Sequence, residues 1–214
     1  MGLQQDQQPK KRTRKRRGRR LEALWVLALA SGMRPGELYG LHWPEVDLEV
    51  GTVKVIRSLE ELKGQYRLKS PKTEESRRTI PIGTRAVQAV QAHRERMRAE
   101  GRDVDHGPVF VNVRGGWLGQ ANVNSKSFKP ILKAAGLPLT FRPYDMRHTC
   151  ATLLLSRDVN VRVVSEGLGH EDIQTTLRFY AHALPNMQAR AVQAINDLLP
   201  ADCPTDVPQE GAAA

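Results

Sequence analysis

The sequence predicts a mainly α-helical (α+β) domain with a small three-stranded antiparallel sheet. Between positions 21 and 199, most apolar residues recur at helical spacing in short segments that end at glycine or proline. Three short strand-like runs follow one another between positions 52 and 82. Apolar residues make up 40% of the 214 residues, which is enough to bury the core of one domain.

The elements of the N-terminal half follow from local signals. The first helix is expected from position 21 to Gly32, and a second, short helix from Pro35, because proline favours the first helical turn. Segment 46–51 is typical of a turn. The three strands are expected at 52–58, 65–69 and 79–82, and Gly64 falls in the turn between the first two.

The C-terminal half repeats the helical period. A helix of roughly four turns is expected after Pro81, and a short strand at 109–113. Five further apolar faces at helical spacing predict helices around 128–135, 146–154, 161–168, 173–180 and 187–198.

The formal charge of +10 is concentrated at the N-terminus. Nine basic residues and one acidic residue fall within positions 1–20, so this segment carries +8 and the rest of the chain +2. Such a run repels itself and binds anionic polymers by releasing counterions. We therefore expect a disordered basic tail at 1–20, one domain at 21–199, a flexible tail at 200–214, and nucleic acid as a partner.

Several protein classes are excluded by what the sequence lacks. No apolar run approaches the length of about 20 residues that a membrane helix needs, and no secretory signal opens the chain. Two cysteines, Cys150 and Cys203, are too few for a disulfide scaffold or a zinc site. His42, His93 and His106 have no partners at ligand spacing, so no metal site is expected. These features predict a cytoplasmic protein with no membrane contact.

Five motifs occur in an order that resembles the catalytic domain of tyrosine recombinases, the phage-integrase and Xer-type family. They span Ala30 to His182, and each is weak alone. The motifs are ASGMRPGEL at 30–38, PKT at 71–73, YDMRHT at 144–149, LGH at 168–170 and TTLRFYAH at 175–182. The resemblance implies the fold of that catalytic domain and an enzyme that cuts and rejoins double-stranded DNA.

The resemblance also implies catalytic roles at six positions: Arg34, Lys72, Tyr144, Arg147, His170 and Tyr180. Two guanidiniums suit a phosphodiester, because paired charge-assisted donors stabilise the charge of its transition state. By resemblance, Tyr180 attacks phosphorus and forms a 3′-phosphotyrosine, Lys72 protonates the leaving 5′ oxygen, and His170 holds the scissile phosphate. The phosphotyrosine stores the bond energy, so no cofactor is required.

Other polar residues receive supporting roles. Glu37 is expected to orient Arg34 from the start of its helix, and His148 to buttress the site. Arg77, Arg78 and Arg142 are expected to contact the DNA backbone, with plain solvent exposure as the alternative. The amphipathic segment 187–199 is expected to mediate self-association on DNA, as the corresponding segment often does in this family.

The sequence departs from the family pattern in two ways. Tyr144 stands where the family usually has histidine, and a tyrosine cannot shuttle protons near neutral pH as imidazole does. Only the basic tail precedes position 21, so the family's N-terminal core-binding domain is expected to be absent. Both points favour the alternative of an impaired, DNA-binding integrase remnant. An RNA-binding accessory protein is a weaker alternative, because aromatic residues make up only 5% of the chain.

Overall fold

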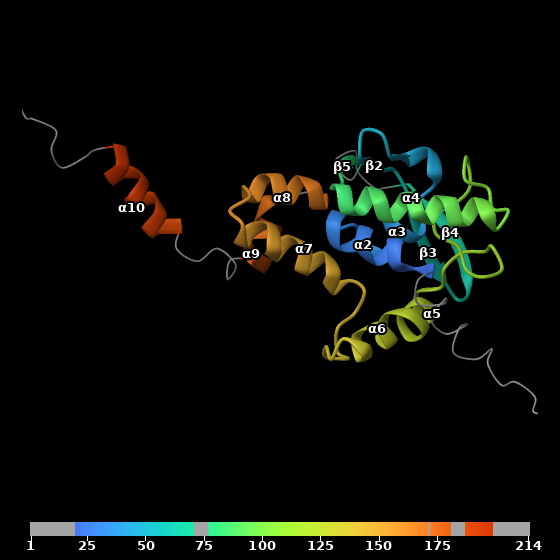
Figure 1. Cartoon of the computed structure of the whole chain (residues 1–214). Helices are drawn as coiled ribbons and strands as arrows, with labels where there is room; N and C mark the ends of the chain where they lie inside the picture. The colour runs from blue at the N-terminus through green and yellow to red at the C-terminus, as the bar shows by residue number, and fades with distance from the viewer. Residues whose placement is uncertain (1–19, 71–76, 171, 181–186, 199–214) are drawn as a thin grey trace, which may run out of the picture.

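The structure is a computed structural model that describes residues 20–70, 77–170, 172–180 and 187–198. Helix α2 (Glu22–Ser31) is a central element of its fold. Helices α4 (Thr84–Ala99) and α7 (Asp145–Ser156) both pack against it (Figure 1). Leu24 and Leu27 are fully buried in the larger apolar cluster. The helix ends because Gly32 takes the left-handed conformation, with φ of 62°. The short helix α3 (Pro35–Tyr39) follows at once.

The predicted three-stranded antiparallel sheet is present, but its strands are not the three that the sequence indicated. Strand β2 (Thr52–Val55) pairs with β1 (Val46–Asp47) on one side and with β5 (Arg78–Pro81) on the other. Val53 lies opposite Ile80 in this register, and both side chains are buried. The expected turn at 46–51 therefore begins as a strand, and its turn starts only after Asp47.

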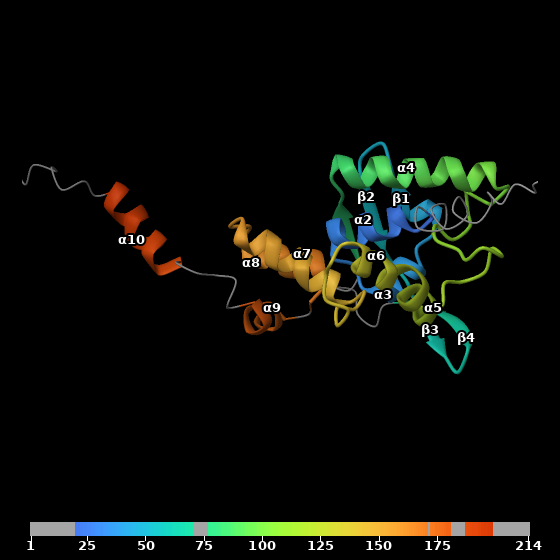
Figure 2. The same ribbon diagram turned by 60° about the horizontal axis from the view of Figure 1, so that its bottom comes forward.

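Strands β3 (Ser58–Leu62) and β4 (Gln65–Lys69) form a separate two-stranded hairpin. The prediction that 65–69 belongs to the three-stranded sheet was wrong. The predicted strand at 52–58 is divided into β2 and β3 at Ile56 and Arg57. Every residue of β4 is exposed, so this strand has no buried face to hold it on the larger sheet, whereas Leu59 of β3 is buried in the larger apolar cluster (Figure 2). The expected strand at 109–113 is also wrong, since that stretch is not a strand, although the Val109 N–H donates to the Leu41 carbonyl at 2.8 Å.

Helices α7, α8 (Val161–Leu168) and α9 (Ile173–Tyr180) pack together around a smaller apolar cluster. It contains Ala151, Leu155, Val164, Leu168 and Tyr180. The Asn160 side chain caps α8 by accepting from the Arg162 N–H, and Gly169 ends that helix with φ of 69°. The three helical predictions for this part of the chain are confirmed (Figure 1).

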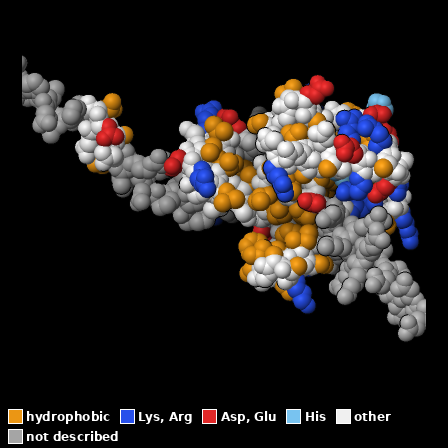
Figure 3. Space-filling model, in the orientation of Figure 1, with side chains coloured by type: hydrophobic (Ala, Val, Ile, Leu, Met, Phe, Trp, Pro, Cys, Tyr) orange, Lys and Arg blue, Asp and Glu red, His pale blue; other side chains and the backbone are white. Residues whose placement is uncertain are grey.

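The remaining helices flank these two clusters. The helix predicted at 128–135 starts earlier, as α5 (Gln120–Val123), a π-helical turn (Asn124–Phe128) and α6 (Lys129–Ala134). A short 3₁₀ turn, Trp43–Glu45, precedes the sheet. Exposed apolar side chains lie on α6, on α7 and in the segment that joins them. Figure 3 shows hydrophobic side chains gathered over this part of the molecule.

Helix α10 (Met187–Leu198) lies away from the other helices in both ribbon views and exposes Val192, Ile195 and Leu198. The predicted N-terminal tail and the C-terminal tail at 200–214 lie outside the described residues, except Arg20. That residue pairs with Glu100 at 2.8 Å, so it belongs to the fold rather than to the tail.

Candidate active site

Arg34 lies at the junction of α2 and α3, where backbone and side-chain contacts fix it. Its backbone N–H donates to Glu37 at 2.8 Å, and its guanidinium donates to the other oxygen of the same carboxylate at 2.9 Å. A third bond runs from Arg34 Nη2 to the Gly169 carbonyl at 3.1 Å. The side chain is still 37% exposed. Arg34 is therefore oriented by protein contacts, those with Glu37 among them, and remains open to a ligand.

Glu37 also binds a second arginine from the sheet. Arg78 donates to both carboxylate oxygens, at 3.1 and 2.8 Å, and to the Gly167 carbonyl at 2.8 Å. Burial alone would raise the pKa of Glu37, but the hydrogen bonds and charges of Arg78 and Arg34 hold it below its ordinary value. The Arg78 side chain is only 7% exposed. The expected role of Arg78 as a DNA-backbone contact does not fit this placement, because its guanidinium is used within the protein.

Arg147 enters the same region from the first turn of α7. Its Nη1 donates to the Gly32 carbonyl at 2.9 Å and to the Leu168 carbonyl at 2.7 Å. Burial, followed by the charge of Arg34, lowers its pKa to about 10, so it keeps its charge at neutral pH. The side chain is 1% exposed, and its Nη2 has no hydrogen-bond partner among the residues that the structure describes. A buried cationic donor without a partner is costly, and an anionic ligand would satisfy it.

His170 follows Gly169, whose carbonyl binds Arg34, and Leu168, whose carbonyl binds Arg147. Its Nδ1 lies 2.7 Å from the hydroxyl of Thr176, which is fully buried on α9. Burial, followed by the charges of Arg147, Arg34 and Arg78, lowers the pKa of His170 to about 4. A neutral imidazole is therefore placed near three cationic side chains, and its hydrogen bond with Thr176 orients it.

Tyr180 ends α9 with its side chain only 3% exposed. Its phenolic Oη lies 2.7 Å from Nδ1 of His148 on α7. Burial raises the pKa of Tyr180, and the charge of Arg147 works in the opposite direction. Tyr144, just before α7, is 40% exposed, and its ring meets His148 edge-on with centroids 5.2 Å apart. Two of the predicted catalytic residues thus flank His148.

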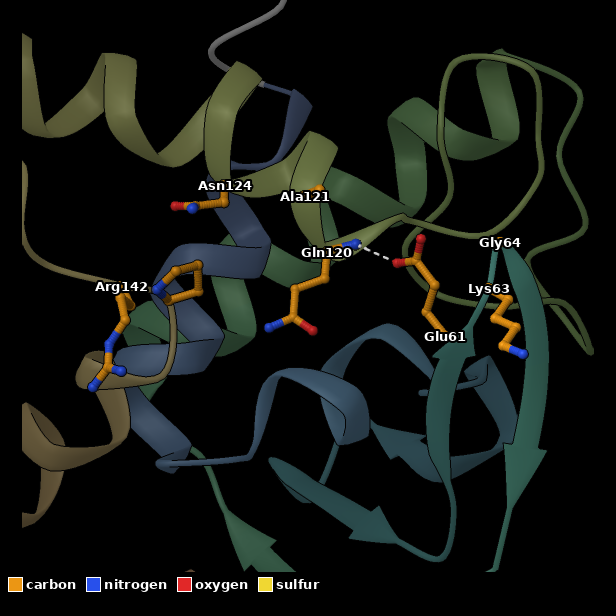
Figure 4. A pocket seen from close by; sticks show the side chains of 8 residues that line it. Glu61, Lys63, Gly64, Gln120, Ala121, Asn124 and Arg142 are labelled. Carbon is orange, nitrogen blue, oxygen red and sulfur yellow. Dashed lines mark hydrogen bonds between the residues drawn. The ribbon is translucent and has the colours of Figure 1, made fainter.

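The remaining predicted site residues are Lys72, Arg77 and Arg142. Lys72 falls outside the described residues. Arg77 is exposed, next to the start of β5. Arg142 is 70% exposed, and its guanidinium pairs with Asp145 at 3.1 Å. Arg142 also lines an open cavity of about 490 Å³ between the β3–β4 hairpin and α5 (Figure 4), whose lining residues include Glu61, Lys63, Gln120 and Asn124.

Two kinds of feature are absent from residues 20–70, 77–170, 172–180 and 187–198. Within those ranges, no group of three or more His, Cys, Asp or Glu side chains is placed to hold a metal ion. No helix of the described chain combines the length and the apolar character needed to span a membrane.

The chain is similar to known proteins in both sequence and fold. The family model described as "Phage integrase family" matches residues 7–187, and the chain belongs to this family. The match corresponds to the catalytic domain of tyrosine recombinases, whose members are DNA strand-transferring enzymes.

A tyrosine recombinase XerC-like protein of Caldanaerobacter subterraneus subsp. tengcongensis is 36% identical over 90% of this chain, which covers 53% of that protein. The ICEBs1 integrase of Bacillus subtilis is 26% identical over 83% of this chain and 49% of that protein. The chain therefore spans about half the length of the curated relatives it matches.

Solved structures support the same fold. The Tn1549 transposon integrase, in complex with a circular intermediate DNA, matches with a TM-score of 0.70 at 23% identity and covers 90% of this chain and 68% of that one. The catalytic domain of the bacteriophage HP1 integrase matches with a TM-score of 0.51 at 22% identity, over 85% of both chains. These matches confirm the predicted tyrosine-recombinase fold.

Sequence reasoning missed three contacts in this site. Arg78 as a partner of Glu37, Thr176 as a partner of His170, and the bond between His148 and Tyr180 all join residues from different elements. A hydrogen bond of the Thr176 hydroxyl could have been predicted from the sequence, because a threonine on the buried face of a helix needs a hydrogen-bond partner. No spacing rule links His148 to a tyrosine 32 residues later.

Proposed function

We propose that this chain cleaves and rejoins DNA by metal-independent transesterification through Tyr180. The observation that carries the proposal is the buried Nη2 of Arg147, which has no partner among the described residues and lies in the same cluster as Arg34. A scissile phosphate would occupy this place. Arg34 and Arg147 would stabilise its non-bridging oxygens, and His170 would assist. The Tyr180 oxygen would form the new bond to phosphorus, while the 5′ oxygen leaves with a proton from Lys72.

A nicked suicide duplex tests this proposal, because loss of a short 5′ strand traps the covalent product. The wild-type chain should form a protein–DNA adduct that survives denaturation, and Tyr180→Phe should form none. Tyr66→Phe is the matched control, since Tyr66 lies on the exposed hairpin strand β4 and should form as much adduct as the wild type. An equal adduct yield from Tyr180→Phe would contradict the proposal.

The second candidate is a DNA-binding remnant without catalysis, and Tyr144 favours it. Its phenol cannot carry protons near neutral pH, unlike the histidine usual at this position in the family. The same assay separates the two functions. Salt-sensitive DNA binding without any adduct, on any substrate, would establish the remnant. Arg34→Ala and Arg147→Ala should bind DNA yet lose cleavage if the first function holds.

Self-association on DNA is proposed for helix α10. Its exposed residues Val192, Ile195 and Leu198 form an apolar surface that the described contacts leave uncovered. A second apolar surface lies over α6 and α7 (Figure 3). Deleting the chain after Pro185 should abolish assembly on DNA, measured by sedimentation, while the circular dichroism of the monomer changes only by the lost helix. Unchanged assembly would refute this role.

The basic segment 1–20 is proposed to add affinity for DNA without reading its sequence. Eight of its basic residues lie before position 20, so deleting residues 2–19 should reduce the salt dependence of DNA binding. Adduct formation at saturating DNA should persist. This DNA-bound role is the basis for proposing that the protein works in the cytoplasm.

A further inference from the structure

The contact between His148 and Tyr180 joins two helices of the smaller apolar cluster. Nδ1 of His148 on α7 lies 2.7 Å from the phenolic Oη of Tyr180 on α9. The two ring centroids are 5.8 Å apart with an interplanar angle of 51°. Tyr180 is nearly buried, so its hydroxyl depends on protein groups rather than bulk water for a partner. The imidazole therefore occupies the position from which the phenolic proton can be taken.

The neighbouring residue Tyr144 cannot do this work. A phenol, unlike an imidazole, is not a proton acceptor near neutral pH. The Tyr144 ring packs edge-on against His148, with centroids 5.2 Å apart, and so covers one side of the imidazole. Position 144 thus carries no proton acceptor for neutral conditions, while an imidazole is present one helical turn later at position 148.

The surroundings of His148 keep it ready to accept a proton. Burial lowers its pKa below the ordinary value, Asp145 raises it, and the charges of Arg147 and Arg142 lower it. Among the described residues, the groups that act on the ring include these three on or next to α7, Tyr144, Tyr180 on α9, and His170, whose own pKa is affected by the charge of His148. At neutral pH the imidazole is uncharged, and Asp145, three residues earlier, would stabilise the imidazolium once it forms.

We infer that His148 is the general base that activates Tyr180, an inference that rests on the proposed function. The neutral imidazole carries its hydrogen on Nε2, and Nδ1 accepts the proton of Tyr180 as Oη bonds to phosphorus. The bond from phosphorus to the 5′ oxygen breaks, and its electron pair stays on that oxygen, which Lys72 protonates. In rejoining, an incoming 5′ hydroxyl gives its proton to Lys72, which the first step left neutral, and its oxygen bonds to phosphorus. The bond from phosphorus to the Tyr180 oxygen breaks, and the imidazolium returns its proton to that oxygen.

Single-turnover cleavage of two nicked duplexes isolates this step. One duplex carries a normal phosphodiester, and the other has sulfur in place of the bridging 5′ oxygen. Sulfur leaves without a proton, so the second duplex bypasses the general acid and still needs the general base. General-base catalysis contributes about 10²- to 10⁴-fold, so His148→Ala should slow cleavage of both duplexes by about 100-fold or more. Lys72→Ala should be slow only on the oxygen duplex.

The pH profile and a second variant separate proton transfer from positioning. Wild-type cleavage should fall as the pH drops through the pKa of His148, and this acidic limb should vanish in His148→Ala. His148→Asn places an amide acceptor near Nδ1 but cannot take the proton, so it should fold, bind DNA and remain slow. Added imidazole should restore part of the rate in His148→Ala. His106→Ala, at an exposed loop position, should match the wild type.

Each outcome decides the inference. Cleavage by His148→Ala within threefold of the wild-type rate would overturn it, and so would full activity of His148→Asn. Rescue of His148→Ala by the sulfur duplex would place the histidine on the leaving-group side instead. If His148→Ala does not fold, as judged by circular dichroism, the His148→Asn rate decides. Absence of an adduct from the wild type on both duplexes would reject the proposed function itself, and the inference with it.

Discussion

Glu37 and Arg78 form a buried ion pair, with each side chain 7% exposed and the Oε2 and Nη2 atoms 2.8 Å apart. The same carboxylate binds Arg34 at 2.9 Å, so one acid links the sheet to an arginine of the candidate site. The balance of charge around Glu37 also matters for Arg147, because the charges of Glu37, Arg34 and Arg78 all act on its guanidinium. Glu37 is the carboxylate that offsets these guanidiniums, and removing it leaves buried positive charge without compensation.

Replacing Glu37 with glutamine should therefore cost far more stability than replacing an exposed acid. Breaking a buried pair typically lowers the free energy of unfolding by about 3 to 5 kcal/mol. Glu166→Gln is the matched control, because its pair with Arg162 on α8 is 66% exposed on the acid side and should contribute about 1 kcal/mol or less. Urea denaturation of both variants measures the difference, and equal losses would contradict the buried role of Glu37.

The stability that Glu37 contributes should also depend on pH. Its pKa is lower in the folded chain than in the unfolded chain, so the unfolded state binds the proton first as the pH falls. The contribution is complete above the unfolded pKa and is lost as the pH falls through the folded one. Unfolding curves between pH 7 and pH 3 should show this loss in the wild type and lack it in Glu37→Gln.

Gly32 and Gly64 offer a test of how the site depends on a helix end. Both have positive φ, 62° and 78°, so alanine at either position should cost about 1 to 2 kcal/mol of backbone strain. At Gly32 an added Cβ would also lie 2.7 Å from Leu168 Cδ2, whereas at Gly64 it meets nothing within 4 Å. Gly32→Ala should lose a further ~1–3 kcal/mol by overpacking.

The two alanine variants should also differ in activity. Gly32 and Leu168 supply the carbonyls that hold Arg147, so pushing them apart should reduce adduct formation on the suicide duplex. Gly64→Ala should leave adduct formation unchanged. Equal adduct yields from the two variants would show that the position of Arg147 does not depend on this contact.

His93 should make the fold sensitive to mild acid. It is 2% exposed and bonded to the Val109 carbonyl, and burial lowers its pKa to about 4, opposed by that carbonyl and aided by Arg96 and Arg20. Between pH 6.5 and 4 the unfolded chain binds a proton that the folded chain excludes. The free energy of unfolding should therefore fall as the pH falls, by about 1.4 kcal/mol per pH unit for this group.

The comparison of His93→Gln with the wild type isolates that slope from other titrating groups. The free energy of unfolding, obtained from denaturant titrations between pH 7 and pH 4, should depend less steeply on pH in the variant. The difference in slope should correspond to about one bound proton. His106→Gln, at an exposed position, should keep the wild-type slope. An unchanged slope in His93→Gln would mean that the buried imidazole is not responsible.

Arg77 and Arg78 are adjacent in sequence but should behave differently. Arg77 is exposed, so Arg77→Ala should weaken DNA binding and reduce its salt dependence by about one counterion while leaving stability intact. Arg78→Ala should lower the free energy of unfolding by about 3 kcal/mol or more, because Glu37 loses its buried partner. Denaturant unfolding and DNA binding at several salt concentrations should be measured for both variants. A larger loss of stability in Arg77→Ala than in Arg78→Ala would contradict this prediction.

The helices were predictable from the sequence because their signals are local. Apolar spacing and terminal glycines such as Gly32 and Gly169 placed α2, α7, α8 and α9. The sequence predicted the correct number of strands in the sheet but the wrong strands, because strand pairing depends on contacts between distant segments. Val46–Asp47 is a strand only because Thr52 and Val53 lie opposite it. The exposed strand β4 shows no alternation of buried residues to reveal that it pairs with β3 alone.

The same distinction applies to the site. The sequence could suggest Arg34, Arg147, His170 and Tyr180 as site residues because each lies in a short motif whose order is recognisable. Their partners were not found, because Arg78, Thr176 and the contact of His148 depend on how α7, α8, α9 and β5 pack. An adjacent pair such as Arg77 and Arg78 has no sequence feature that says which side chain points inward.

The anchors of Arg147 are main-chain atoms, the carbonyls of Gly32 and Leu168. A carbonyl oxygen is present whatever side chain its residue carries, so substitution at these two positions cannot delete the acceptor but can only displace it. The orientation of this arginine is thus encoded in the path of the backbone, at the ends of α2 and α8. Variants selected for altered DNA targets can change many surface side chains and keep this guanidinium in register, provided that both helices end where they now do.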